Sequence, residues 1–306
     1  MAAYLGRRIL QSLLILVGIS IVTFVLLYML PADPAAQVAG RSASPAMIAN
    51  VRHELGLDQP IYKQYFRYAG GLLQGNLGRS YLERTEVTTL IASRFPATLQ
   101  LMIGGVICEL ALGLTIGIIA ALRRDSRVDQ ILMVTMFVTV SSPQFVLGII
   151  LLYVFAFELG WFPIGGYGGL RHLVLPSLTL GILGAGWYGR MMRSSMLDVL
   201  RQDYIRTARA KGLSRITIVL GHALPNAVLP IIAMIGIDIG NFMGGFVVVE
   251  SVFGWPGIGN LTWLAIQRID IPIIMGVTVI SACAIVIGNL LADIIVPAID
   301  PRIKLK

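Results

Sequence analysis

Long, uncharged apolar runs constrain the fold of this chain more than any other feature of its sequence. Residues 9–30 carry no charged side chain, and residues 101–122 carry a single one. About 20 such residues form a helix long enough to cross a bilayer core roughly 30 Å thick. The 306 residues are 56% hydrophobic and only 13% charged, whereas an ordinary soluble domain is about 25% charged. We therefore expect an all-α integral membrane protein.

Six spans are predicted where apolar runs are bounded by charged residues, proline and glycine. The fourth is interrupted by Pro176 and by several glycines, so we expect it to be kinked or only partly exposed to lipid. The predicted spans cover residues 9–30, 97–122, 131–157, 173–192, 226–250 and 274–297.

The basic residues beside the spans predict the orientation of the chain, because cytoplasmic loops carry an excess of Lys and Arg. With six spans, one side receives Arg7, Arg8, residues 123–127, the basic stretch 190–215 and the basic C-terminal residues. The other side receives little more than Arg171 and Arg268 outside one long segment. Both termini are therefore predicted to be cytoplasmic, in a multi-pass protein of the inner or plasma membrane. The net charge of +8 is thus a topology signal and does not indicate a nucleic-acid partner.

These signals divide the chain into three predicted regions. Residues 1–30 form a cytoplasmic N-terminus and the first span, and residues 31–95 form a small extracytoplasmic cap. Residues 96–306 form the membrane core, which includes a cytoplasmic loop at about residues 193–225. The cap carries basic residues on the outer side, but segments longer than about 60 residues largely escape the charge rule.

Three short helices are expected in the cap. Ser44 followed by Pro45 predicts one helix start, and Gly56 predicts its end. Pro60 predicts a second start, and a third helical pattern opens at Thr85.

The sequence lacks the groups that an enzymatic function would need. It has no Gly-Lys pair for a phosphate-binding Walker loop and no G-x-S-x-G elbow for a serine hydrolase. His53, His172 and His222 are far apart, and Cys108 and Cys283 fall in apolar runs, so neither a metal site nor a disulfide is predicted. We expect a transport subunit with no ATPase site, metal or cofactor of its own. If ATP drives transport, ATP and Mg are bound by separate ATPase subunits.

The cytoplasmic stretch of residues 195–220 is the most informative segment, because it is too charged to enter lipid and is rich in helix-forming residues. Arg206, Arg209 and Lys211 alternate with small residues, and Gly212 then interrupts the helical pattern. A short helix, a glycine break and a second helix would offer a compact surface to a cytoplasmic partner. Composition alone equally allows a solvated loop of the positive-inside kind.

This segment resembles the signature loop of the binding-protein-dependent ABC importer permeases, in which Glu-Ala-Ala, Gly, Ile and Leu-Pro follow at fixed spacing. Aligned on Gly212, residues 206–208 stand at Glu-Ala-Ala, His222 stands at Ile, and Leu224 and Pro225 stand at Leu-Pro. The spacing matches in full, while three residue types differ. The run DYIRTARAKG, which starts at Asp203, looks like the version found in the dipeptide and oligopeptide branch. Other segments that resemble this branch are LPADPA (30–35), LGLDQP (55–60), GNLGRS (75–80), RFPATL (94–99), LPSLTLG (175–181) and VFGWPGIG (252–259).

The resemblance implies the six-helix type I permease fold and a set of partners. These are a second permease subunit, expected to be a different protein, two cytoplasmic ATPase subunits and an extracytoplasmic substrate-binding protein. It also implies that the helix of residues 203–211 docks in a cleft of the ATPase. The residues assigned to this coupling loop are Asp203, Tyr204, Arg206, Thr207, Ala208, Arg209, Ala210, Lys211, Gly212, Leu224 and Pro225.

The resemblance makes short peptides, di- or oligopeptides, the expected cargo. Glutathione and nickel chelates, which related systems of the branch carry, are the alternatives within the same importer class. A passive channel or a secondary transporter is the alternative outside it, but we find no internal repeat of the kind that secondary transporters show.

Two acidic residues and a glycine repeat stand out inside the predicted spans. Ionisable groups at bilayer depth are costly and usually face a cavity or a partner, so Glu109 and Asp238 either line a pathway or serve a structural role. Gly236, Gly240 and Gly244 recur every four residues, a spacing that lets helices approach closely. This stripe packs either inside the subunit or against the second permease.

Overall fold

The computed structural model describes residues 2–28, 33–40, 42–242 and 245–299. No β-strand occurs in these residues, where Arg79 and Glu86 form an isolated β-bridge. The chain divides into two compact units. Unit 1 contains Met1–Thr98, Met243–Val247 and Pro256–Ile287, and unit 2 contains Leu99–Phe242, Val248–Trp255 and Gly288–Lys306.

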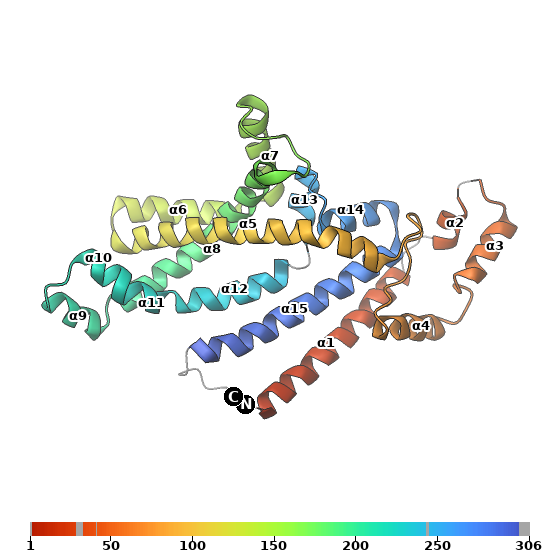
Figure 1. Ribbon diagram of the computed structural model, residues 1–306, viewed down its shortest axis with the longest axis horizontal. Coiled ribbons are helices and arrows are strands. Elements are labelled where there is room, and N and C mark those ends of the chain that lie inside the picture. Colours follow the sequence, from red (N-terminus) through yellow and green to blue (C-terminus); the bar gives the residue numbers. More distant parts are fainter. Residues whose placement is uncertain (1, 29–32, 41, 243–244, 300–306) are drawn as a thin grey trace. The chain divides into compact units, whose positions relative to one another are not determined.

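Unit 1 contains the first long helix, the cap helices and two helices from the C-terminal part of the chain (Figure 1). Its core joins Val87 and Ile91 with Ile258, Leu261 and other apolar residues. Its helices are α1 (Ala2–Tyr28), α2 (Pro34–Ala39), α3 (Pro45–Glu54), α4 (Ile61–Leu73), the first part of α5 (Val87–Leu122), α14 (Ile258–Arg268) and most of α15 (Ile271–Ile299).

The structure confirms two of the helices expected in the cap. Ser44 caps α3, because its Oγ accepts a hydrogen bond from the backbone N–H of Met47 at 3.3 Å, and Pro60 directly precedes α4. The third pattern, from Thr85, is not a separate helix but leads into the start of α5, which runs without a break into the predicted second span. The sequence prediction missed α2, which Asp33 caps.

Two sets of contacts anchor the cap within unit 1. The ring of Phe24 in α1 lies 5.5 Å from that of Tyr65 and 5.9 Å from that of Tyr68, both in α4. In the second set, Asp270 is only 2% exposed, and its carboxylate accepts hydrogen bonds from Ser80 Oγ at 2.5 Å and from the backbone N–H of Leu82 at 3.2 Å. A buried carboxylate satisfied in this way holds the end of the cap in one conformation.

Unit 2 contains the remaining helices, with α8 packed against α6 and α7. Those not yet named are α6 (Arg127–Ser141), α7 (Gln144–Leu151), η1 (Leu152–Glu158), α8 (Gly169–Val199), α9 (Asp203–Ala210), α10 (Arg215–Thr217), η2 (Ile218–Ala223), α11 (Leu224–Ala227), α12 (Leu229–Phe242) and α13 (Val247–Phe253). The segments η1 and η2 are π-helical.

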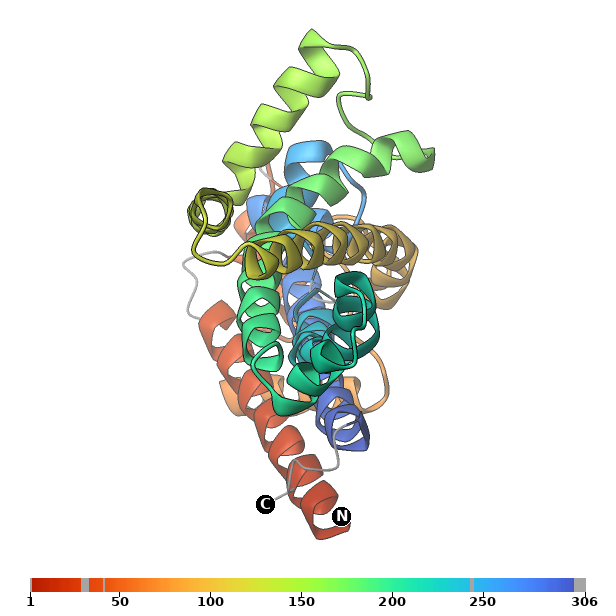
Figure 2. The same cartoon turned by 90° about the vertical axis from the view of Figure 1, so that its left-hand side faces the viewer.

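The third predicted span, residues 131–157, is not one straight helix. The chain bends by 105° between Arg127–Ser141 and Gln144–Glu158, and Figure 2 shows α7 turning away from α6. Pro143 stands at the break, where it has no N–H to donate and keeps Ser142 in an extended conformation. The predicted span contains this proline, and the helix breaks at it.

The fifth predicted span, residues 226–250, is also interrupted, because α12 ends at Phe242 and α13 begins at Val247. Gly245 between them has a φ of 85°, a left-handed conformation that favours glycine. A Cβ at this position would lie 2.6 Å from the backbone N of Gly259, so the close approach also requires glycine.

The fourth predicted span lies in α8, which stays helical through Pro176. Glycines of α5 let this helix approach closely. A Cβ on Gly117 would lie 2.7 Å from the Cβ of Met192 and 3.1 Å from the backbone N of Arg193. This glycine of α5 therefore packs inside the subunit.

Three helices among the described residues are long and apolar enough to cross a membrane, and counting each of two bent pairs as one span brings the number to five. The three are Gly6–Leu26, Val87–Leu122 and Ile271–Leu290. The predicted first, second and sixth spans fall on these helices. The total of six stays a prediction, because α8 is not in this set.

Candidate functional site

The predicted coupling helix is present as α9, and its two faces differ. Ile205 and Ala208 are buried, at 0% and 6% exposure. On the other face Tyr204 is 44% exposed, and Arg206 and Thr207 are exposed as well. Arg209, Ala210 and Lys211 are also exposed. The helix thus presents a basic outer surface on an apolar base.

Gly212 ends this helix by its backbone conformation and not by its small size. Its φ is 75°, while a Cβ at this position would meet no atom within 4 Å. The N–H of Gly212 donates to the carbonyl of Arg209 at 3.0 Å, and the N–H of Leu213 donates to that of Ala208 at 3.4 Å. This left-handed helix end turns the chain toward α10.

The chain returns to the core through α10, η2 and α11. Ser214 caps α10, with its Oγ accepting a hydrogen bond from the N–H of Thr217 at 3.2 Å. Leu224 is half-buried, while Pro225 next to it is exposed at the start of α11. Of these two residues, both predicted as part of the coupling loop, Leu224 packs against the core and only Pro225 is at the surface.

The buried face of α9 belongs to an apolar cluster that links several helices of unit 2. Ile205 and Ala208 pack in the same cluster as Tyr188, Met192 and Met196 of α8. The cluster continues through Ile218, Val219 and Ala223 of η2 to Ala227 of α11 and Ile231 of α12. Because such cores are close-packed, a displacement of α9 requires these helices to move or repack.

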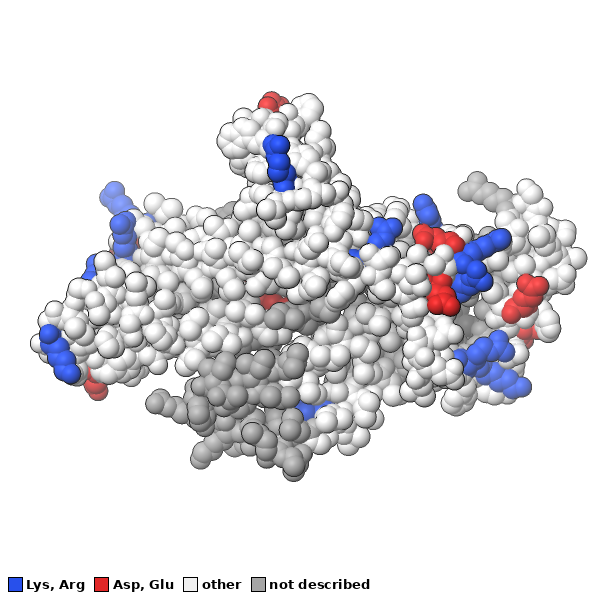
Figure 3. Space-filling model, in the orientation of Figure 1, with Lys and Arg blue, Asp and Glu red and all other residues white. Residues whose placement is uncertain are grey.

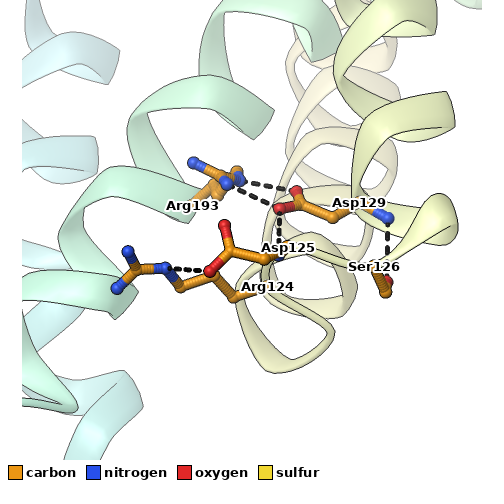
Figure 4. Close-up of polar contacts among 5 residues, drawn as sticks. All are labelled: Arg124, Asp125, Ser126, Asp129 and Arg193. Carbon is orange, nitrogen blue, oxygen red and sulfur yellow. Dashed lines mark hydrogen bonds and ion pairs between the residues drawn. The ribbon is translucent and has the colours of Figure 1, made fainter.

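A buried ion pair holds α8 to the start of α6 beside this cluster (Figure 4). Arg193 of α8 donates from Nε to Asp129 Oδ1 at 2.7 Å and from Nη2 to Oδ2 at 2.6 Å. The side chain of Asp129 is 4% exposed and that of Arg193 is 22% exposed. Asp129 Oδ2 also accepts from the backbone N–H of Asp125 at 3.0 Å, and Ser126 caps the helix. The bidentate geometry fixes the position of α8 relative to α6.

Sequence reasoning missed this pair, although one signal for it was available. Ser126 followed three residues later by Asp129, just before an apolar run, is the pattern of a capped helix start. The pattern does not show that Arg193, 64 residues away, completes the site.

The basic loop residue Arg215 also has a structural contact, since its Nη2 donates to the carbonyl of Leu122 at 2.8 Å.

The two predicted intramembrane carboxylates lie in one polar cluster, together with Tyr188. The hydroxyl of Tyr188 in α8 donates to Asp238 Oδ2 in α12 at 2.5 Å. Glu109 of α5 is only 2% exposed and lies close enough to Asp238 for their charges to interact. Among the described residues, Glu109 Oε1 has no hydrogen-bond partner. Tyr188 could not be distinguished from a core aromatic residue in the sequence.

Of the glycine stripe, Gly236 and Gly240 lie on α12, and Gly244 lies outside the described residues. Whether this stripe packs inside the subunit or against a second permease stays a prediction.

Comparison with known proteins places the whole chain beside one family. Residues 113–305 match the family described as the inner membrane component of binding-protein-dependent transport systems, and residues 1–102 match the N-terminal region of such components. The chain is 41% identical to the glutathione transport system permease protein GsiC of Escherichia coli O6:H1, over 306 residues and 100% of both chains. It is 40% identical, with the same coverage, to the proteins of that name from Escherichia coli K12 and Salmonella paratyphi A.

The fold is similar to solved structures of an inward-facing MetNI methionine ABC transporter. The TM-scores for two crystal forms are 0.58 and 0.54, at 18% sequence identity. In both cases the match covers 69% of this chain and 96% of the other. The likeness shows a shared type I permease fold.

Proposed function

The chain belongs to the family of binding-protein-dependent ABC importer permeases, and we propose that its cargo is a short peptide, with glutathione as the first candidate. A permease subunit of this class is an integral inner membrane protein that works with a partner permease, separate ATPase subunits and a substrate-binding protein. The observation that carries the cargo proposal is the identity of 41% over the full length of a glutathione permease. Glutathione is itself a tripeptide, so the peptide and glutathione hypotheses describe cargo with the same amide and carboxylate groups. Nickel chelates remain the alternative.

We propose that the exposed face of α9 docks with the ATPase. Its exposed basic residues, its apolar base and the left-handed end at Gly212 support this proposal. The apolar cluster and the Asp129–Arg193 pair connect α9 and α8 to the rest of unit 2. Closure of the ATPase would then move several helices together, as alternating access requires.

The cluster of Glu109, Tyr188 and Asp238 fits a structural role better than a place along the pathway. Glu109 is enclosed, and the hydrogen bond between Tyr188 and Asp238 joins α8 to α12. Tyr188→Phe removes one hydrogen bond to a carboxylate, worth about 1.5–3 kcal/mol. It should lower the thermal stability of the importer while leaving the apparent KM for cargo unchanged. A raised KM at unchanged stability would instead place the cluster on the pathway.

The cargo is tested by the ATPase activity of the complete importer, reconstituted with its binding protein. Glutathione, alanylalanine, a tripeptide and a nickel chelate are compared at equal concentration. Stimulation by glutathione or by the peptides supports the proposal. Stimulation by the nickel chelate alone would reject a peptide cargo while retaining the importer mechanism.

A further inference from the structure

A cavity of about 1100 Å³ lies in unit 1, between the cap and the ends of α1 and α15. Small-molecule sites typically enclose roughly 300–1,000 Å³. Its wall is formed by α2 with the preceding Asp33, by α3 and α4, by the segment of residues 76–84, by the start of α15 and by Phe24 of α1. The cavity is therefore large enough for a ligand of several residues, and most of its wall belongs to the cap, which is predicted to lie outside the membrane.

Four arginines and one carboxylate line this cavity. Arg52 and Asp33 form an ion pair, with Nη2 and Oδ2 2.5 Å apart, so their charges offset one another. The remaining arginines are Arg67, Arg79 and Arg84, and all three are exposed. Figure 3 shows basic side chains gathered on this part of the surface, with acidic ones between them. The lining itself keeps an excess of three positive charges.

Arg67 and Arg79 are held in place mainly by neutral groups. Arg79 Nε donates to the backbone carbonyl of Arg84 at 2.6 Å, and Arg67 Nη2 donates to Gln59 Oε1 at 3.0 Å. The charge of Asp58 also acts on Arg67, but Asp58 does not line the cavity. In the described part of the chain, the Arg84 guanidinium forms no hydrogen bond or ion pair. It is therefore available to an anion, and guanidinium groups bind carboxylates with two parallel hydrogen bonds.

A further hydrogen-bond donor faces this region without a partner. The hydroxyl of Tyr68, a lining residue, is enclosed and makes no hydrogen bond to the residues that the structure describes. Burial raises the pKa of Tyr68 to about 12, so the hydroxyl keeps its proton at neutral pH. A buried donor of this kind costs free energy until it finds an acceptor.

We propose that this cap cavity binds a short peptide through its carboxylate, with Arg79, Arg84 and the Tyr68 hydroxyl as the donors. The inference rests on the proposed peptide cargo and adds a site on the permease that receives it outside the membrane. Polar side chains such as Gln64 and Asn76, and the glycines of the wall, suit a peptide with its own amide groups. A phospholipid headgroup offers a similar anion, but its chains need a longer apolar surface.

The test uses the complete importer in nanodiscs of zwitterionic lipid, without ATP and without the binding protein. Equilibrium binding of radiolabelled glutathione is compared with that of glutathione whose two carboxyl groups are amidated. We expect saturable binding of glutathione and at least tenfold weaker binding of the amidated form. Arg79→Gln and Arg84→Gln should each weaken glutathione binding about tenfold, the equivalent of about 1.4 kcal/mol. Binding of the amidated form should be as strong in either variant as in the unmodified importer, because that form has no carboxylate for the arginines to bind.

Lys63→Gln is the matched control, because Lys63 is an exposed residue of α4 that does not line the cavity. It removes the same charge and should leave binding unchanged. Tyr68→Phe provides a second variant if an arginine variant does not assemble. Equal binding of the two glutathione forms, or unchanged binding in both arginine variants, would overturn the proposal. Competition by anionic lipid in place of glutathione would assign the cavity to lipid.

To separate this inference from the proposed function, ATP-dependent uptake is measured with the same importer and variants in proteoliposomes, with the binding protein and ATP present. Uptake of glutathione without any cap binding rejects the cavity site alone. Absence of uptake for both glutathione and alanylalanine rejects the peptide cargo itself.

Discussion

At the scale of single residues, Gly212 must be glycine because of its backbone conformation. Its φ of 75° disfavours any side chain, although the surrounding space is open. Gly212→Val should abolish uptake and leave membrane insertion intact, since a β-branched residue strains a left-handed position by more than the usual 1–2 kcal/mol. The measurement is transport in vesicles with matched protein levels.

Gly221 offers a control in the same segment, because a Cβ there meets no atom within 4 Å and its φ is ordinary. Gly221→Val should therefore transport normally. Normal uptake by Gly212→Val would reject the role assigned to the turn.

The Asp129–Arg193 pair should be essential for stability because both charges are largely enclosed. Asp129→Asn leaves the guanidinium without its anion, and breaking a buried pair costs about 3–5 kcal/mol. We expect a clear fall in Tm in detergent. The double variant Asp129→Asn with Arg193→Gln should recover part of the loss.

Arg124→Gln is the corresponding surface control, since its partner Asp125 has a side chain that is 78% exposed. Exposed pairs contribute at most about 1 kcal/mol. Equal effects of Asp129→Asn and Arg124→Gln would contradict the structural role of the buried pair.

A histidine in the cap should titrate above its ordinary pKa. His53 Nδ1 lies 2.7 Å from Asp58 Oδ2, and this hydrogen bond raises the pKa of His53 above 6.5 and lowers that of Asp58. The protonated form of His53 therefore contributes its full stabilisation of the cap below pH 6.5, and this contribution is lost as pH rises through the raised pKa of His53. The ionised form of Asp58 contributes in turn at higher pH, and its contribution is lost as pH falls through the lowered pKa of Asp58.

NMR titration of histidine-labelled protein measures this pKa directly. Asp58→Asn should return the pKa of His53 to about 6.5. A titration curve that Asp58→Asn leaves unmoved would show that the two side chains are not paired in solution.

At the scale of elements, the two faces of α9 should respond differently to the same charge. Arg206→Glu changes an exposed residue whose ion pair with Asp203 spans 3.5 Å at the surface, so stability should stay within about 1 kcal/mol while ATP-coupled uptake falls. Ala208→Glu places a charge in the apolar cluster and should lower the Tm of the subunit itself. Tm and uptake are measured for both variants. Loss of uptake in Ala208→Glu only would show that α9 supports the fold without contacting the ATPase.

Local sequence signals predicted the starts of α3 and α4 but missed α2, and they predicted the helix interruptions poorly. Ser44 and Pro60 mark helix starts because caps and proline act on their own turn of backbone. Pro143 breaks a predicted span, whereas Pro96 and Pro176 lie within continuous helices. A proline alone does not decide between these outcomes, because packing around it offsets the lost hydrogen bond.

At the scale of the whole molecule, apolar runs were sufficient to predict a helical membrane protein, and the loop around Gly212 was sufficient to predict its family. Contacts between distant residues could not be predicted in this way. Asp270 and Ser80 are separated by 190 positions, and Tyr188 and Asp238 by 50. No periodicity pairs such residues, because the pairing follows from how the helices pack. The same limit explains why the cap cavity was not foreseen.

The central claim is that this subunit imports its cargo only when separate ATPases and a binding protein act on it. The most direct measurement is uptake of labelled glutathione and dipeptides by proteoliposomes that contain the chain with its partner permease, ATPases and binding protein. The account predicts uptake that stops when either ATP or the binding protein is omitted. Flux that continues without ATP would contradict it and would favour a passive channel or a secondary transporter.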